Sequence, residues 1–161
     1  MYTINKVLPG IFIGNYDAAS NIVLLQHHEI THILIVGEGL AQRFPNNYTY
    51  KQINIYDLAS CNIHQYFEEC NDFITNCLKQ KGKILIHCDT GISRAPTILI
   101  AYLMKTKNIG FTQGLEIVKK KHPEAQPNNG FASQLLQYQN SLEALSKRDG
   151  MKNDICSCIV I

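Results

Sequence analysis

The residues with the clearest chemical potential lie in one short segment. Cys88 and Arg94 are separated by five residues, which are Asp89, Thr90, Gly91, Ile92 and Ser93. An apolar run precedes this segment and a helical pattern follows it, so we expect a loop between a buried strand and a helix. Backbone N–H groups of such a loop converge at a helix N-terminus, where the helix dipole favours an anion. The segment therefore predicts a phosphate-binding loop, residues 88–94, in which Gly91 lets the chain turn.

Two side chains of this loop carry the predicted chemistry. A helix N-terminus and a nearby guanidinium favour a thiolate over a thiol, which makes Cys88 a nucleophile. Arg94 presents a planar fork that holds two phosphate oxygens, and lysine replaces it poorly. His87, directly before the loop, is interpreted either as an ordinary buried strand histidine or as a residue that tunes the thiolate.

A displacement at phosphorus also needs a proton donor for the leaving oxygen. We expect this acid on a loop at the sheet edge where the sites of α/β proteins collect. Asp57 follows a predicted strand and fits this position, whereas Glu68, Glu69 and Asp72 lie within a helical pattern. Asp89 belongs to the loop itself and lies too close to a bound phosphate to protonate the leaving group.

The pattern along the chain predicts strands that alternate with helices. Apolar or alternating runs indicate strands at residues 3–7, 11–13, 32–36, 51–56 and 83–87, and a turn at residues 9 and 10 makes the first two a hairpin. Three- and four-residue spacing of apolar residues indicates helices capped by Asp17, beginning at Tyr66, and over residues 98–104, 111–121 and 131–145. This order predicts an α/β fold with a central, mostly parallel sheet flanked by helices.

Length and composition predict one domain and give no signal for a nucleic-acid partner, a metal site or a membrane span. The 161 residues carry a net charge of +2, which is too small to predict a nucleic-acid partner. The six cysteines and six histidines do not stand at zinc-ligand spacing, so we expect reduced thiols and no metal. The longest apolar stretch is far shorter than the roughly 20 residues of a membrane span, and the N-terminus has no secretory pattern. We expect a cytoplasmic monomer with a domain at residues 1–146 and a polar tail at residues 147–161.

The chain resembles the dual specificity protein phosphatases of the cysteine-dependent class. The resemblance covers nearly the whole domain and rests on residues 8–15, 30–36, 57, 87–94, 127–131 and 134–135. It implies that Cys88 forms a phosphocysteine, that Arg94 clamps the phosphate, and that Asp57 acts first as an acid and then as a base. Asn128 is interpreted either as a brace between the active-site loops or as a turn or helix-cap residue. The resemblance also implies phosphorylated protein substrates and no cofactor.

We expect a small, atypical member of this family, because no extra N-terminal domain precedes the catalytic one. Two features of the loop region bear on turnover and on substrate. Many relatives have serine or threonine directly after the arginine, where the hydroxyl assists hydrolysis of the phosphocysteine. This chain has Ala95, which predicts slow turnover. The pair Ala95-Pro96 also resembles the prenylated phosphatases of regenerating liver, but Ser93 follows the dual specificity pattern, so the broader family is kept. Asp89, Thr90 and Ile92 stand where lipid phosphatases place basic residues, so a phosphoinositide substrate is disfavoured.

The end of the sequence fits a prenylation motif. Cys158 is followed by Ile159, Val160 and Ile161, which is the pattern of a prenylated cysteine, and Cys156 is positioned to receive a second lipid. These residues predict a phosphatase tethered to a cytoplasmic membrane face. Two alternatives stay open: a tethered module that binds phosphoproteins with slow turnover, and a phosphatase of a non-protein substrate.

Overall fold

The computed structural model describes the backbone of residues 1–157 and the side chains of residues 1–150. The strands are β1 (Ile4–Leu8), β2 (Ile11–Gly14), β3 (His32–Val36), β4 (Thr49–Ile53) and β5 (Ile84–His87). The helices are α1 (Tyr16–Ala19), α2 (Ile22–His27), η1 (His64–Tyr66), α3 (Phe67–Lys79), α4 (Arg94–Lys107), α5 (Phe111–Lys119) and α6 (Asn129–Ser157). The predicted lipidation site Cys158 lies outside the described residues, and the side chain of Cys156 is not described.

The strands form one mixed sheet in the order β1-β2-β5-β3-β4. β1 and β2 pair antiparallel, and Gly10 in the turn between them has a φ of 76°. The pairs β2–β5, β5–β3 and β3–β4 are all parallel. The prediction of a mostly parallel sheet that begins with a hairpin is therefore confirmed.

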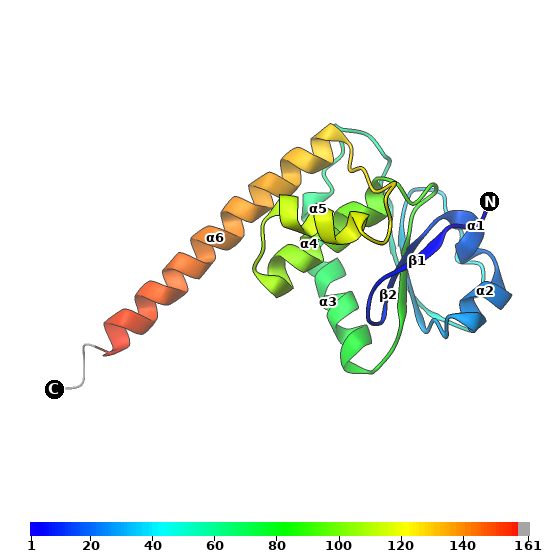
Figure 1. The fold of residues 1–161 in the computed structure, drawn as a ribbon, viewed down its shortest axis with the longest axis horizontal. Helices are drawn as coiled ribbons and strands as arrows, with labels where there is room; N and C mark the ends of the chain where they lie inside the picture. Colours follow the sequence, from blue (N-terminus) through cyan, green and yellow to red (C-terminus); the bar gives the residue numbers. More distant parts are fainter. Residues whose placement is uncertain (158–161) are drawn as a thin grey trace.

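Helices cover both faces of the sheet (Figure 1). Side chains alternate along each strand, so Ile84 and Ile86 of β5 enter one core while Leu85 enters the other. The larger core packs under α3 and α4, with α5 and α6 outside them, and the smaller one lies under α1 and α2. β5 is buried along its whole length at the centre of the sheet, which fixes the position of the loop that follows it.

Two local predictions are wrong. Asp17 does not cap a helix, because the side chain of Asn15 accepts the hydrogen bond from the N–H of Ala18 and Asp17 lies inside α1. The expected single helix is two short ones, and Asn21 caps the second. The strand predicted at residues 51–56 ends at Ile53, so Asp57 lies on the following loop and not directly past the strand.

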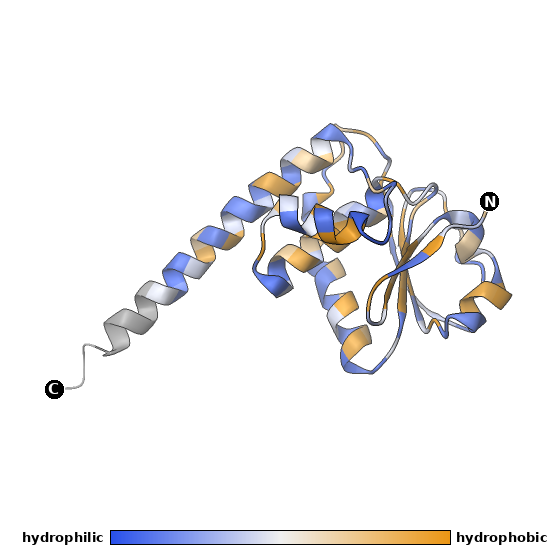
Figure 2. Cartoon of the chain, in the orientation of Figure 1, coloured by the Kyte–Doolittle hydropathy of each residue, from blue (hydrophilic) through white to orange (hydrophobic). Residues whose placement is uncertain are grey.

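α6 is the longest helix and projects from the domain toward the C-terminus (Figure 1). It packs on α4 near its start, where Phe131, Leu135 and Tyr138 are buried. Hydrophilic and hydrophobic residues alternate along the projecting part (Figure 2). Within the described residues, no helix is long and apolar enough to cross a membrane.

Candidate active site

The predicted phosphate-binding loop, residues 88–94, joins the end of β5 to the start of α4. Gly91 occupies its sharpest point with a φ of 80°, in the left-handed region that favours glycine. A Cβ atom at Gly91 would lie 2.9 Å from the carbonyl oxygen of Gly14 on β2. Both the backbone angle and the close approach therefore require glycine at this position.

The carbonyl groups of this loop are held from outside. The N–H of Tyr16 donates to the carbonyl of Asp89 at 3.0 Å, and the N–H of Gln126 donates to that of Ile92 at 2.7 Å. In a trans peptide the C=O of one residue and the N–H of the next point in opposite directions. These contacts therefore turn the N–H groups of Thr90 and Ser93 toward the inside of the loop.

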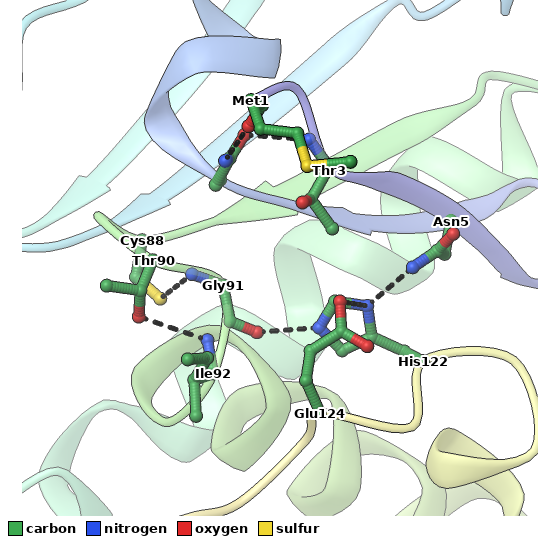
Figure 3. A network of polar contacts seen from close by, with 10 residues as sticks. Met1, Thr3, Asn5, Cys88, Thr90, Gly91, Ile92, His122 and Glu124 are labelled. Carbon is green, nitrogen blue, oxygen red and sulfur yellow. Dashed lines mark hydrogen bonds and ion pairs between the residues drawn. The ribbon is translucent and has the colours of Figure 1, made fainter.

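The thiol of Cys88 lies within the curve of the loop. Its side chain is buried, with 1% exposure. The N–H of Gly91 donates a hydrogen bond of 3.2 Å to Sγ of Cys88 (Figure 3). The N–H groups of Thr90, Ser93 and Arg94 have no acceptor among the residues that the structure describes. The loop thus presents donors to an anion, and one of them already contacts the sulfur.

Arg94 is the first residue of α4 and is nearly buried, with 9% exposure. Its Nη1 donates to the carbonyl of Ile55 at 3.2 Å, which joins the loop to the segment before Asp57. Its buried Nε has no hydrogen-bond partner within the described part of the chain. A buried guanidinium nitrogen without an acceptor is costly, and a phosphate oxygen is the natural partner.

Asp57 and Asn128 lie together at the mouth of the loop. Nδ2 of Asn128 donates a hydrogen bond of 2.8 Å to Oδ1 of the exposed Asp57. The N–H of Asn128 donates to Oγ of Ser93 at 3.0 Å, and Oδ1 accepts from the N–H of Phe131 at 2.9 Å. Asn128 therefore caps α6 and bridges the Asp57 segment to the phosphate-binding loop at the same time.

His87 ends β5 and is 1% exposed. Burial, together with the charge of Arg94, lowers the pKa of His87 to about 4, against a smaller opposing effect from its hydrogen bond. Nδ1 lies 3.1 Å from the carbonyl oxygen of Cys88, which only accepts, so Nδ1 carries the proton of a neutral ring. At neutral pH the imidazole supplies no positive charge to Cys88, and Arg94 is the cation of the loop.

The sequence of residues 11–141 matches the catalytic domain of the dual specificity phosphatases. The chain belongs to the dual specificity phosphatase family. It is a protein phosphatase, and its α/β fold agrees with this membership.

Relatives of this phosphatase match it over most of its length. Dual specificity protein phosphatase 1B of Arabidopsis thaliana is 38% identical over 140 residues, which are 87% of this chain and 84% of that protein. Dual specificity protein phosphatase 19 of Mus musculus is 40% identical over 141 residues, which are 88% of this chain and 64% of that protein. The crystal structure of human tyrosine phosphatase-like serine/threonine/tyrosine-interacting protein is similar with a TM-score of 0.82, at 32% identity, over 85% of this chain and 95% of that chain.

The loop at residues 88–94 is also held by hydrogen bonds from residues that the sequence patterns did not indicate. His122 and Gln126, on the segment between α5 and α6, both bond to the loop. Tyr16 does so from the start of α1. Gln126 and Tyr16 act through backbone N–H groups, which leave no signature in the residue type. His122 is an isolated histidine in the sequence, and only its burial in the fold distinguishes it.

Proposed function

We propose that this phosphatase hydrolyses phosphotyrosine and phosphoserine or phosphothreonine in proteins through a phosphocysteine on Cys88. The observation that carries the proposal is the loop of inward N–H groups around Sγ of Cys88, together with the buried Nε of Arg94, which has no hydrogen-bond partner among the described side chains and backbone groups. A phosphate dianion would satisfy these donors together.

In the first step, the Cys88 thiolate attacks phosphorus and an S–P bond forms as the P–O bond to the substrate breaks. The leaving oxygen takes a proton from the carboxylic acid of Asp57. Arg94 and the loop N–H groups bind the phosphoryl oxygens throughout the step. They stabilise the negative charge that these oxygens carry in the transition state. The hydrogen bond from Asn128 holds Asp57 in place for this transfer.

In the second step, water attacks the phosphocysteine and Asp57, now a carboxylate, accepts a proton from this water. The S–P bond breaks, the thiolate is restored and inorganic phosphate leaves. Ala95, fully buried on the first turn of α4, offers no hydroxyl to the departing sulfur. We infer that this second step limits the rate.

Exposure at the mouth of the loop supports acceptance of more than one phosphoamino acid. The side chain of Asp57 is exposed, and Ile92 of the loop is 39% exposed. An acid near the surface is within reach of the short side chains of phosphoserine and phosphothreonine as well as the longer phosphotyrosine. Assays with phosphopeptides that differ only in the phosphorylated residue measure this preference.

The experiment that tests the mechanism is a rapid-quench time course with a chromogenic aryl phosphate. We expect a burst of phenol stoichiometric with enzyme, then slow steady turnover, and no release from Cys88→Ser. Asp57→Asn should slow hydrolysis more for esters with poor leaving groups than for those with good ones, since only the former need a proton. Equal losses for both kinds of ester would remove Asp57 from the acid role.

Ala95 also supports a second candidate, a phosphoprotein-binding module with little turnover. In that case phenol release would not depend on Cys88, while the Cys88→Ser variant would bind phosphoprotein as tightly as the wild type. A third candidate, a phosphatase of a non-protein substrate, would show higher kcat/KM for phosphorylated sugars or RNA ends than for phosphopeptides.

Lipid attachment at Cys158, with a second lipid on Cys156, stays a prediction of the sequence. So does the division into a catalytic domain at residues 1–146 and a tail at residues 147–161. The intact mass of the protein from eukaryotic cells, compared with that of Cys158→Ser, measures whether a prenyl group is present. Fractionation of the two proteins between membrane and cytosol measures whether it tethers the enzyme.

A further inference from the structure

His122 is fully buried between the phosphate-binding loop and β1, with no exposed surface. Its Nε2 lies 2.7 Å from the carbonyl oxygen of Gly91, and its Nδ1 lies 2.8 Å from Nδ2 of Asn5 (Figure 3). The imidazole therefore connects the tip of the loop to the first strand of the sheet. No step of the proposed mechanism involves His122.

These partners determine which ring nitrogen carries a proton. A carbonyl oxygen only accepts, so Nε2 is the donor to Gly91. The amide nitrogen of Asn5 donates, so Nδ1 is the acceptor in this bond. Oε1 of Glu124 also lies near Nδ1, at 3.5 Å, which is beyond the usual hydrogen-bond range. Asn5 is therefore the hydrogen-bond partner of Nδ1, and Nε2 is the donor to Gly91.

We propose that His122 is a positioning residue for phosphate binding, an inference that rests on the proposed function of the loop. By holding the carbonyl of Gly91 on the outer side, the Nε2–H of His122 turns the N–H of Ile92 toward the inside of the loop. This N–H makes a long hydrogen bond of 3.3 Å to Oγ1 of Thr90. It is therefore available to a phosphate oxygen.

The side chain is needed at this point because no backbone N–H in the described part of the chain donates to the carbonyl of Gly91. Glycine visits many backbone conformations, and a peptide plane at a glycine rotates with little steric cost. The carbonyls of Asp89 and Ile92, by contrast, are held by backbone N–H groups of other segments. His122 provides at Gly91 the outer contact that the backbone provides at the neighbouring positions.

The decisive comparison is between His122→Gln and His122→Asn. A glutamine amide nitrogen occupies about the position of Nε2 and still donates to Gly91, whereas asparagine reaches only the position of Nδ1. We would measure the Kd of inorganic phosphate by calorimetry and the unfolding temperature of each variant. We expect Gln to bind within about twofold of the wild type, and Asn to bind at least about fivefold more weakly, the lower end for a lost hydrogen bond.

A merely structural role would lower the unfolding temperature of both variants without separating their phosphate affinities. Equal Kd values for wild type and His122→Asn, or equal losses for Asn and Gln, would overturn the inference. Since binding is measured without turnover, the readout does not depend on the catalytic steps. Failure of the wild type to bind phosphate would overturn the proposed function of the loop as well.

Two further measurements keep the test independent of how well the His122 variants fold. A long-range ¹H–¹⁵N spectrum of the wild type should show a protonated Nε2, and a proton on Nδ1 alone would contradict the inference. Asn5→Leu leaves Gly91 and His122 in place but removes the donor to Nδ1. This change should weaken phosphate binding by about twofold or more, and an unchanged Kd would argue against the Asn5 contact.

Discussion

Asn128 donates a hydrogen bond of 2.8 Å to the carboxylate of Asp57, across 71 positions of the sequence. The same residue caps α6 through Oδ1 and bonds to Ser93 of the phosphate-binding loop through its N–H. The loop that carries the candidate acid and the loop that carries the candidate nucleophile are thus joined through one side chain and its backbone. A second connection runs from Arg94 to the carbonyl of Ile55.

Replacement of Asn128 should separate its two functions. Asn128→Ala loses both the cap and the contact to Asp57, so we expect a loss of about 1 kcal/mol in unfolding free energy and a large fall in kcat. Asn128→Asp keeps a capping oxygen for Phe131 but cannot donate to Asp57. Urea unfolding should show stability recovered in the Asp variant, while its kcat stays low. Recovery of both properties would show that the contact to Asp57 does not matter.

Gly91 and Gly39 form a matched pair for testing the loop. Both have positive φ angles, 80° and 73°, but a Cβ at Gly39 meets nothing within 4 Å. Gly39→Ala should lower the free energy of unfolding by about 1 kcal/mol, because an L residue is strained at a positive φ. Gly91→Ala adds a clash with the Gly14 carbonyl and should abolish phosphate binding, measured by calorimetry. Similar phosphate affinity in the two variants would contradict the close approach seen here.

Ala95→Ser should restore a hydroxyl beside the leaving sulfur. We expect the steady-state rate after the burst to rise severalfold, because the hydroxyl would assist breakdown of the phosphocysteine. The burst itself reports the first step and should keep its amplitude and rate, which makes it an internal control in the same rapid-quench trace. An unchanged steady rate would mean that hydrolysis of the intermediate is not limited by this residue.

The buried His87 should make folding sensitive to acid. Its pKa is lowered to about 4 in the folded protein from 6.5, so between these values the unfolded chain binds a proton that the native state excludes. Stability is therefore lost as the pH falls from about 6.5 toward 4, by about 2 kcal/mol between pH 7 and pH 5. Urea unfolding across this range measures the slope.

His87→Asn keeps a donor for the Cys88 carbonyl but no longer titrates, so its stability should vary less with pH. Urea unfolding of the wild type in the same buffers gives the reference slope. If the His87 variant kept the full slope, another group would be responsible for the acid sensitivity.

Local signals in the sequence were sufficient for the fold class, and they correctly placed residues 88–94 between a buried strand and a helix. Short buried strands alternate in hydrophobicity, helices repeat their apolar residues every three or four positions, and Cys88 and Arg94 share one loop of fixed length. These patterns depend on neighbours along the chain, which is why they are readable without a structure. The capping residue of the first helix was predicted wrongly because Asn15 and Asp17 lie close together and both residue types cap helices well.

Only the tertiary structure decided which distant groups support that loop. The contacts of Asn128 with Asp57, of His122 with Gly91, and of Arg94 with Ile55 join segments that are 31 to 71 residues apart. Their partners are largely backbone atoms, which every residue possesses, so no residue type in the sequence identifies them. The packing of α4 on β5 and of α6 on α4 brings these segments together, and burial then gives an isolated histidine such as His122 a specific partner.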